Sequence, residues 1–147
     1  MKKTETLKNG ILVLAEKQKY AHSVTSGIYV KAGADYETER QLGISHLLEH
    51  MIFRGGRKLP QKDIYEKMND LGTSFRGETS FSYVHWHIQC MPECCLDSLN
   101  LFVEILNSTD WEEAEFNKEK QVVRRQIDLK KEPSFRHHML WTSEQNK

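Results

Sequence analysis

The residues best suited to chemistry in this chain are His46-Leu47-Leu48-Glu49-His50. On a helix with 3.6 residues per turn, His46, Glu49 and His50 share one face. Neutral imidazole nitrogens are good zinc ligands, and a carboxylate that is not a ligand can take a proton from water activated by the metal. The pentapeptide therefore predicts a metal site that activates water. The alternative is a helix whose histidines only make hydrogen bonds in the core.

The residues around the pentapeptide favour a buried helix. Apolar side chains surround the polar triplet, namely Leu42, Leu47, Leu48, Met51, Ile52 and Phe53. Gly43 precedes the segment, and Gly55-Gly56 follows it as a glycine stop signal. We therefore expect the two histidines and Glu49 on a well-terminated helix.

Apolar periodicity and turn residues predict the elements that must position this helix. The Asn9-Gly10 pair signals a hairpin. The expected elements are strands at 11–15 and 24–33, a helix from Leu59-Pro60 to Gly72, an antiparallel strand pair within 73–89, a helix from Pro92 to 107–108, and a charged helix over 111–131. The tail, 136–147, has no predicted element. The prediction is an α+β fold, an antiparallel sheet covered by helices, in a single domain spanning 1–147.

Composition argues against some classes of partner. Lys and Arg total 21, as do Asp and Glu, so the formal net charge is zero and no global field attracts nucleic acid or an anionic membrane. No apolar run approaches the length of a membrane span, and no apolar segment follows Lys2-Lys3. Three crowded cysteines fit reduced thiols better than a disulfide framework. We therefore expect a cytoplasmic protein that binds neither nucleic acid nor membrane.

Three segments together resemble the pitrilysin/insulinase family of zinc metallopeptidases, which includes processing peptidases. They are the metal helix, the helix-then-strand segment after it, and the distal sequence around Val122-Val123. The order H-x-x-E-H is the inverzincin signature. The resemblance implies that His46 and His50 bind Zn²⁺ and that Glu49 is the general base. It also implies a functional Glu119, acting around the metal ligands.

The third-ligand position that the resemblance implies is occupied by Gln126 where the family carries Glu. Seven residues separate Glu119 from Gln126, so both should look toward the metal helix from one helix face. An amide oxygen can ligate zinc but brings no charge, so we expect weaker binding. Three interpretations stay open: a natural attenuated site, a non-catalytic relative, or an engineered Glu→Gln change.

A second departure from the family pattern is Arg76-Gly77, where relatives usually carry Asn-Ala. The family pairs extended peptides with an edge strand near this segment, so Arg76 and Gly77 are candidate substrate-binding residues, with Arg76 favouring an acidic partner. The alternative is a solvent-facing Arg on an edge strand.

A third departure is length, because the resemblance covers only the first part of a catalytic domain. The chain would be a fragment, a truncated form or a small relative that needs a second domain, subunit or identical copy to complete a chamber. The expected function is zinc-dependent cleavage of a peptide or polypeptide. The alternative is a non-catalytic peptide-binding or assembly subunit of a peptidase pair.

Two weaker candidates complete the set. His85 and His87 would lie on one face of a strand at a spacing that metal sites sometimes use, although a half-exposed strand face is the simpler interpretation. Cys94-Cys95 could gain reactivity at a helix start, but no base is near them in sequence, which favours small buried residues.

Overall fold

A computed structural model describes residues 1–130 of the 147-residue chain. Its strands are β1 (Lys2–Thr6), β2 (Leu12–Glu16), β3 (Val24–Val30), β4 (Ser74–Thr79) and β5 (Val84–Cys90). Its α-helices are α1 (Ile44–Arg54), α2 (Gln61–Asp70), α3 (Cys95–Asn107) and α4 (Glu113–Lys130). Short 3₁₀ turns, η1 (Ala34–Tyr36) and η2 (Pro92–Cys94), precede α1 and α3.

The main sheet has the order β3-β5-β4, and both strand pairs are antiparallel. The predicted strand pair within 73–89 is therefore confirmed as β4 and β5. β5 is central because it pairs with both neighbours, which leaves β4 as an edge strand. The register sets Gly77 opposite Trp86 and Glu78 opposite His85.

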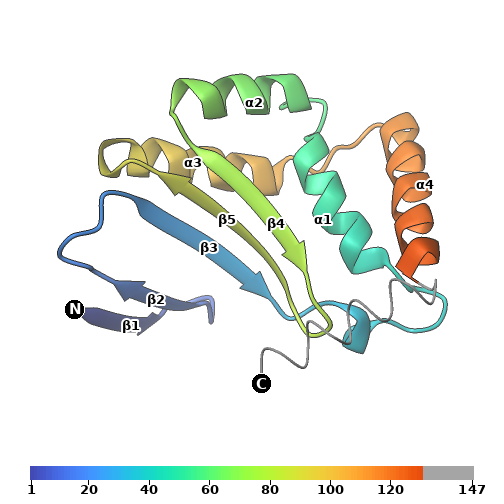
Figure 1. Ribbon diagram of the computed structural model, residues 1–147, viewed down its shortest axis with the longest axis horizontal. Helices are drawn as coiled ribbons and strands as arrows, with labels where there is room; N and C mark the ends of the chain where they lie inside the picture. Colours follow the sequence, from blue (N-terminus) through green and yellow to red (C-terminus); the bar gives the residue numbers. More distant parts are fainter. Residues whose placement is uncertain (131–147) are drawn as a thin grey trace.

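The core lies between one face of this sheet and the helices. Val84, Trp86 and Ile88 alternate along β5 and are almost fully buried. The period of two in a strand puts all three on the same face. They join Phe102 and Ile105 of α3 in one apolar cluster. Figure 1 shows α3 and α1 lying over this sheet. The predicted α+β class, an antiparallel sheet covered by helices, is confirmed.

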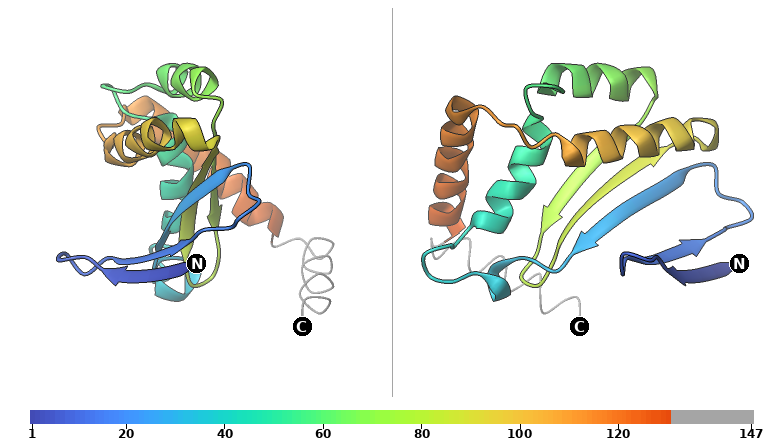
Figure 2. Two further views of the ribbon diagram at one scale, coloured as in Figure 1. Left: turned by 90° about the vertical axis from the view of Figure 1, so that its left-hand side faces the viewer. Right: turned by 180° about the vertical axis from the view of Figure 1, so that it is seen from behind.

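Helix α4 packs beside α1, although the two are far apart in sequence (Figures 1 and 2). Position 111 lies before the helix, which begins at Glu113. The predicted end of this helix at Lys131 and the tail at 136–147 lie outside the described residues. Helix α4 is thus the element that can bring Glu119 and Gln126 to the metal helix.

The hairpin of β1 and β2 forms a separate two-stranded sheet (Figure 2). Its turn contains Asn9 and Gly10, as the sequence predicted, and Gly10 has a positive φ of 87°. Every residue in both strands is exposed. The predicted strand at 24–33 is shorter in the structure and ends at Val30.

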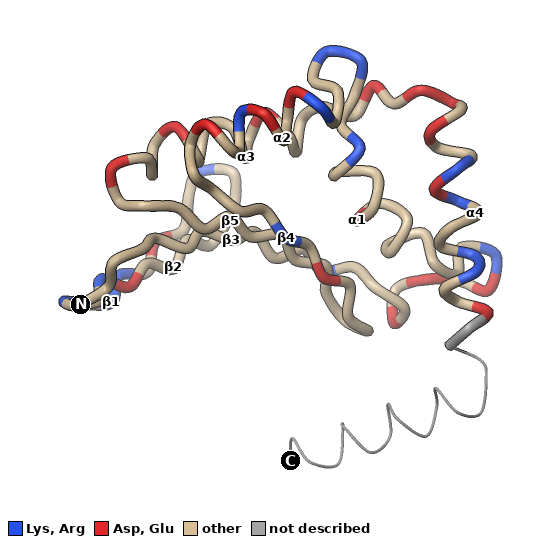
Figure 3. The backbone as a smooth tube through the Cα atoms, turned by 45° about the horizontal axis from the view of Figure 1, so that its top comes forward, with Lys and Arg blue, Asp and Glu red and all other residues tan. Residues whose placement is uncertain are grey.

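Acidic and basic residues are interspersed along the chain, as the colours of the backbone tube in Figure 3 show. This distribution agrees with the formal net charge of zero. Among residues 1–130, none of the helices combines the length and the apolar character that crossing a bilayer requires.

Candidate metal centre

Helix α1 presents His46, Glu49 and His50 on one face. The two imidazole rings meet edge to face with their centroids 4.7 Å apart. One possible ligand atom from each of the three side chains lies within 4.8 Å of the others, and all three residues are partly buried. In the part of the chain that the structure describes, no other cluster of three or more His, Cys, Asp or Glu residues meets this criterion.

The N-terminus of α1 is held by Glu37, which lies in the loop before it. The Glu37 carboxylate accepts hydrogen bonds from the backbone N–H of Gly43 at 2.7 Å and of Ser45 at 2.8 Å. The Ser45 hydroxyl in turn accepts from the backbone N–H of Gly33 at 2.9 Å. Burial would raise the pKa of Glu37, but the hydrogen bonds from Ser45 and Gly43 outweigh it and the pKa is lowered. A carboxylate therefore satisfies two free N–H groups at the start of the helix that carries His46.

The Glu49 carboxylate lies between α1 and β4. Its Oε2 is 3.3 Å from Nδ1 of His46 and accepts a hydrogen bond from the Thr79 hydroxyl at 3.1 Å. Burial would raise the pKa of Glu49, yet the hydrogen bonds with His46 and Thr79 and the charges of the two imidazoles lower it. Glu49 is thus held in its ionised form, which can accept a proton.

Helix α4 brings two side chains to the histidines. Oε1 of Gln126 lies 2.7 Å from Nε2 of His46, and Oε2 of Glu119 lies 2.9 Å from Nδ1 of His50. Both residues therefore face α1, as their spacing of seven predicts. A carboxylate oxygen accepts, so the His50 Nδ1–H donates to Glu119 and leaves Nε2 of that ring for a metal.

Glu119 is one of the most buried polar residues of the described chain, with a side chain 1 % exposed. Its second oxygen forms an ion pair with Arg54. The other terminal nitrogen of Arg54 donates to Oε1 of Gln61 at 3.1 Å. One guanidinium therefore connects α1 to both α2 and α4.

The side chains of His46, His50 and Gln126 offer donor atoms that zinc accepts, but we expect them to bind it weakly. Tetrahedral zinc, with bonds of about 2.1 Å to nitrogen and oxygen, sets two ligand atoms about 3.4 Å apart. Nε2 of His46 and Oε1 of Gln126 are 2.7 Å apart, so the pair would have to open by roughly 0.7 Å to share an ion. Gln126 also brings no charge to the dication. The donor types therefore suit zinc, whereas the spacing requires this opening and the charge of the donor set is low.

Arg76 and Gly77 are neighbours on β4 but face opposite sides of the sheet. A Cβ atom added to Gly77 would come within 2.9 Å of Cγ of Glu49, so this position lies directly against the metal helix. Arg76 is exposed and pairs opposite His87 on the other face. Gly77 therefore lies at the site, and Arg76 lies on the edge strand beside it.

The two weaker candidates form separate contacts. His85 Nε2 lies 3.2 Å from Nδ1 of His87, with Tyr29 stacked on the His85 ring. Glu78 Oε2 lies 3.8 Å from Nδ1 of His85, but within residues 1–130 these side chains do not bring three possible ligand atoms together as His46, Glu49 and His50 do. Burial and the neighbouring Cys90 raise the pKa of Cys95, which argues against a reactive thiolate.

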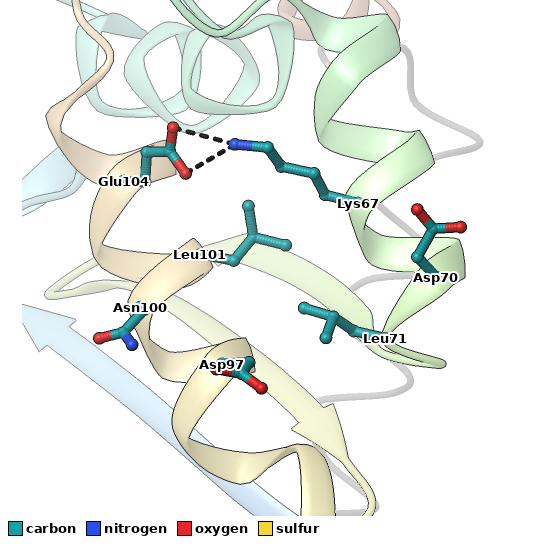
Figure 4. Close-up of a pocket in the computed structure, with 7 residues that line it drawn as sticks. All are labelled: Lys67, Asp70, Leu71, Asp97, Asn100, Leu101 and Glu104. Carbon is teal, nitrogen blue, oxygen red and sulfur yellow. Dashed lines mark hydrogen bonds and ion pairs between the residues drawn. The ribbon is translucent and has the colours of Figure 1, made fainter.

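A hollow between α2 and α3 lies apart from the metal helix (Figure 4). The Lys67 ammonium bridges it by donating to both oxygens of Glu104, at 3.0 and 2.9 Å. Its lining includes neither histidine of α1. The hollow is therefore separate from the α1 cluster.

Three residues of the site escaped the sequence analysis. Arg54 could have been found, because it follows His50 by four residues and so shares its helix face. Thr79 could have been found as the residue two positions beyond Gly77 on the same strand face. Glu37 carries no local signal, since its role depends on how its loop folds back onto α1.

The site combines three features: an antiparallel sheet, a helix packed across it that carries H-x-x-E-H, and a second helix that faces the two histidines. The H-x-x-E-H motif defines the inverzincin class of metallopeptidase-like proteins. A family model described as Insulinase (Peptidase family M16) matches residues 12–145. The chain belongs to this family, which confirms the resemblance seen in the sequence.

Individual relatives agree with this family. The chain is 34 % identical over 121 residues to an uncharacterized zinc protease of Rickettsia felis, which covers 82 % of this chain and 29 % of the relative. It is 29 % identical over 122 residues to a probable mitochondrial-processing peptidase subunit beta of Arabidopsis thaliana, covering 83 % of this chain and 23 % of the relative. The crystal structure of a protease from Helicobacter pylori superposes with a TM-score of 0.77 at 28 % identity, covering 86 % of this chain and 30 % of that one. The chain thus spans less than a third of the length of these relatives.

Proposed function

We propose that this chain is the metal-binding part of a zinc-dependent endopeptidase that cleaves peptides or polypeptides. The observation that carries the proposal is the position of Glu49, an ionised carboxylate fixed by His46 and Thr79 between two potential ligands and the edge strand β4. Relatives named zinc protease and processing peptidase support the same chemistry.

In this proposal His46, His50 and Gln126 would hold the zinc ion. The ion, when bound, polarises the scissile carbonyl and makes water more acidic. Glu49 accepts a proton from the attacking water and returns it to the leaving amine. Glu119 orients the His50 ring through its hydrogen bond to Nδ1.

The peptide would lie along β4, which is an edge strand of the described sheet. Backbone hydrogen bonds to a free strand edge bind an extended peptide without regard to its sequence. Gly77 lies against Glu49, and Arg76 on the other face would favour an acidic side chain. The span of less than a third of its relatives supports a second domain, subunit or identical copy that completes the chamber.

The second candidate function is a non-catalytic peptide-binding or assembly subunit. The neutral Gln126, beside His46 where the family expects a charged ligand, favours it. In this case the fold and the strand edge persist while the metal binds too weakly to act.

Zinc binding separates the two candidates. Competition with a chromophoric chelator, with elemental analysis, should give about one zinc per chain. The substitution Gln126→Glu should raise zinc affinity by at least tenfold, whereas Gln121→Glu, on an exposed position of the same helix, should not. The absence of zinc in the presence of added metal would overturn the catalytic proposal. Equal affinity for both variants would remove Gln126 from the ligand set.

Hydrolysis tests the role of Glu49. The substitution Glu49→Gln should leave zinc affinity nearly unchanged and abolish cleavage of a quenched fluorescent peptide, because only proton transfer is lost. Retained cleavage would exclude Glu49 as the base.

A cytoplasmic location stays a prediction, which cell fractionation tests.

A further inference from the structure

We propose that Arg54 is a positioning residue of the metal centre, which holds Glu119 against His50 and thereby fixes the orientation of that imidazole. The inference rests on the proposed zinc site and adds a residue that is neither a ligand nor the base. It starts from spacing, because His46, His50 and Arg54 follow one another at intervals of four along α1. Residues four apart lie on the same side of a helix, so all three face α4.

The contacts form a continuous chain from metal ligand to anchor. His50 Nδ1–H donates to Oε2 of Glu119 at 2.9 Å, and the other oxygen of Glu119 pairs with Nη2 of Arg54. Nη1 of Arg54 donates to Oε1 of Gln61 at 3.1 Å. Each carboxylate oxygen of Glu119 therefore has its own partner.

Burial makes the Arg54 contact necessary. The Glu119 side chain is only 1 % exposed, so water cannot replace a lost partner on the oxygen that Arg54 binds. A buried carboxylate with one oxygen unpaired is costly and turns toward whatever donor or solvent it can reach. Such a turn would also move the oxygen that His50 binds, because both oxygens belong to one rigid group.

The orientation of the His50 ring would determine how tightly a metal binds. With the proton fixed on Nδ1 by Glu119, the Nε2 lone pair is free to bind a metal. Without that hydrogen bond, the ring can carry its proton on either nitrogen and can rotate. Loss of such an outer hydrogen bond costs about 10- to 100-fold in metal affinity.

The guanidinium group is suited to this position. Its planar fork reaches acceptors on two different helices at once, Glu119 on α4 and Gln61 on α2. A lysine at position 54 could pair with Glu119 but could not reproduce both contacts in that plane. The Arg54 side chain is itself 30 % exposed, so its charge keeps partial contact with water.

The test compares R54M, R54K and E119Q in the 147-residue chain. Zinc dissociation constants come from chelator competition, and ¹⁵N shifts of the His50 ring report which nitrogen carries the proton. We expect R54M to weaken zinc binding about 10- to 100-fold and to mix the His50 tautomers. R54K should recover most of the zinc affinity and most of the single His50 tautomer, because a lysine can still pair with Glu119. R57M, at an exposed arginine three residues after α1 ends, should change neither.

A double variant separates positioning from simple scaffolding. If Arg54 acts through Glu119, R54M combined with E119Q should bind zinc no more weakly than E119Q alone. An additive loss, or an R54M affinity within twofold of the original chain, would overturn the proposal. If R54M does not fold, R54Q carries the same comparison.

The tautomer measurement keeps this inference separate from the proposed function. If the original chain binds no zinc, the proposed function fails, but the metal-free spectra of His50 still report on Arg54. An unchanged Nδ1–H signal in R54M would then refute the role of Arg54 by itself.

Discussion

Replacement of Gly77 by alanine tests whether Glu49 is placed by the space left for it on β4. A Cβ at position 77 would lie 2.9 Å from Cγ of Glu49 and 2.9 Å from Cε2 of Phe53. Carbon atoms make their best contact at about 3.5–4.0 Å, so the side chains of Glu49 and Phe53 on α1 must move away from β4 by roughly 0.6 Å or more. Gly77 does not have a positive φ, so the substitution changes space without straining the backbone.

The Cγ atom lies near the helix backbone, so a turn of the carboxylate alone cannot relieve the contact. Either the Glu49 side chain changes rotamer or α1 moves away from β4. The Thr79 hydrogen bond to Glu49, now 3.1 Å, would lengthen to roughly 3.7 Å and cease to be a hydrogen bond. Overpacking of this kind lowers the free energy of unfolding by about 1–3 kcal/mol.

The expected functional pattern is selective. Glu49 is the proposed base and not a ligand, so zinc affinity should stay within about threefold, whereas displacement of a catalytic group by about 1 Å can lower turnover about 100-fold. Urea unfolding gives the stability, chelator competition gives the affinity, and cleavage of a quenched peptide gives the turnover.

A second substitution separates the two crowded side chains. Adding F53L to G77A removes ring atoms from the contact with Phe53 and should recover stability without recovering turnover. The control is Gly27→Ala on β3, where the nearest atom would lie at an ordinary 3.4 Å. If G77A keeps its stability within about 0.5 kcal/mol and its turnover within twofold, the space at Gly77 does not position Glu49.

Further predictions concern stability. Glu37→Ala removes the cap of α1 and should cost about 1–2 kcal/mol in urea unfolding at pH 7. Folding lowers the pKa of Glu37, so its contribution to the free energy of unfolding is fully present above the unfolded pKa of about 4.3. That contribution is lost as the pH falls through the lower folded pKa. A loss of stability in Glu37→Ala that is as large at pH 3 as at pH 7 would contradict this account. Ile105→Ala, at a fully buried position, should cost about 2–5 kcal/mol, and a cost below 1 kcal/mol would mean that the site collapses without a cavity. Gly33→Ala should lower the thermal midpoint sharply, because φ is +111° there and a Cβ would lie 2.4 Å from the carbonyl oxygen of Ser80; an unchanged midpoint would show that this loop can rearrange.

The sequence predicted the elements well where their signals are local. Helix α1 carries its own apolar pattern and is bounded by Gly43 and Gly55, both with positive φ, so its limits could be read from the chain. The strand at 24–33 was predicted three residues too long at its C-terminal end, because Lys31 and Ala32 continue its composition after the pairing with β5 has ended at Val30.

The site was predictable only in part. The face shared by His46, Glu49 and His50 follows from helical spacing. The common helix face of Glu119 and Gln126 follows from their separation of seven residues. Which residues complete the site depends on long-range packing. The placement of Gly77 beneath Glu49 requires the angle at which α1 crosses the sheet, and no local pattern encodes that angle.

The β1–β2 hairpin has a consequence for local unfolding. All of its strand residues are exposed, and an isolated two-stranded hairpin is marginally stable in water. Its amide hydrogens should therefore exchange with solvent through local opening, while those of Trp86 and Ile88 in central β5 should exchange mainly through global unfolding. Hydrogen exchange would thus divide the described chain into two units of very different protection, and the proposed metal centre would belong to the slowly exchanging one.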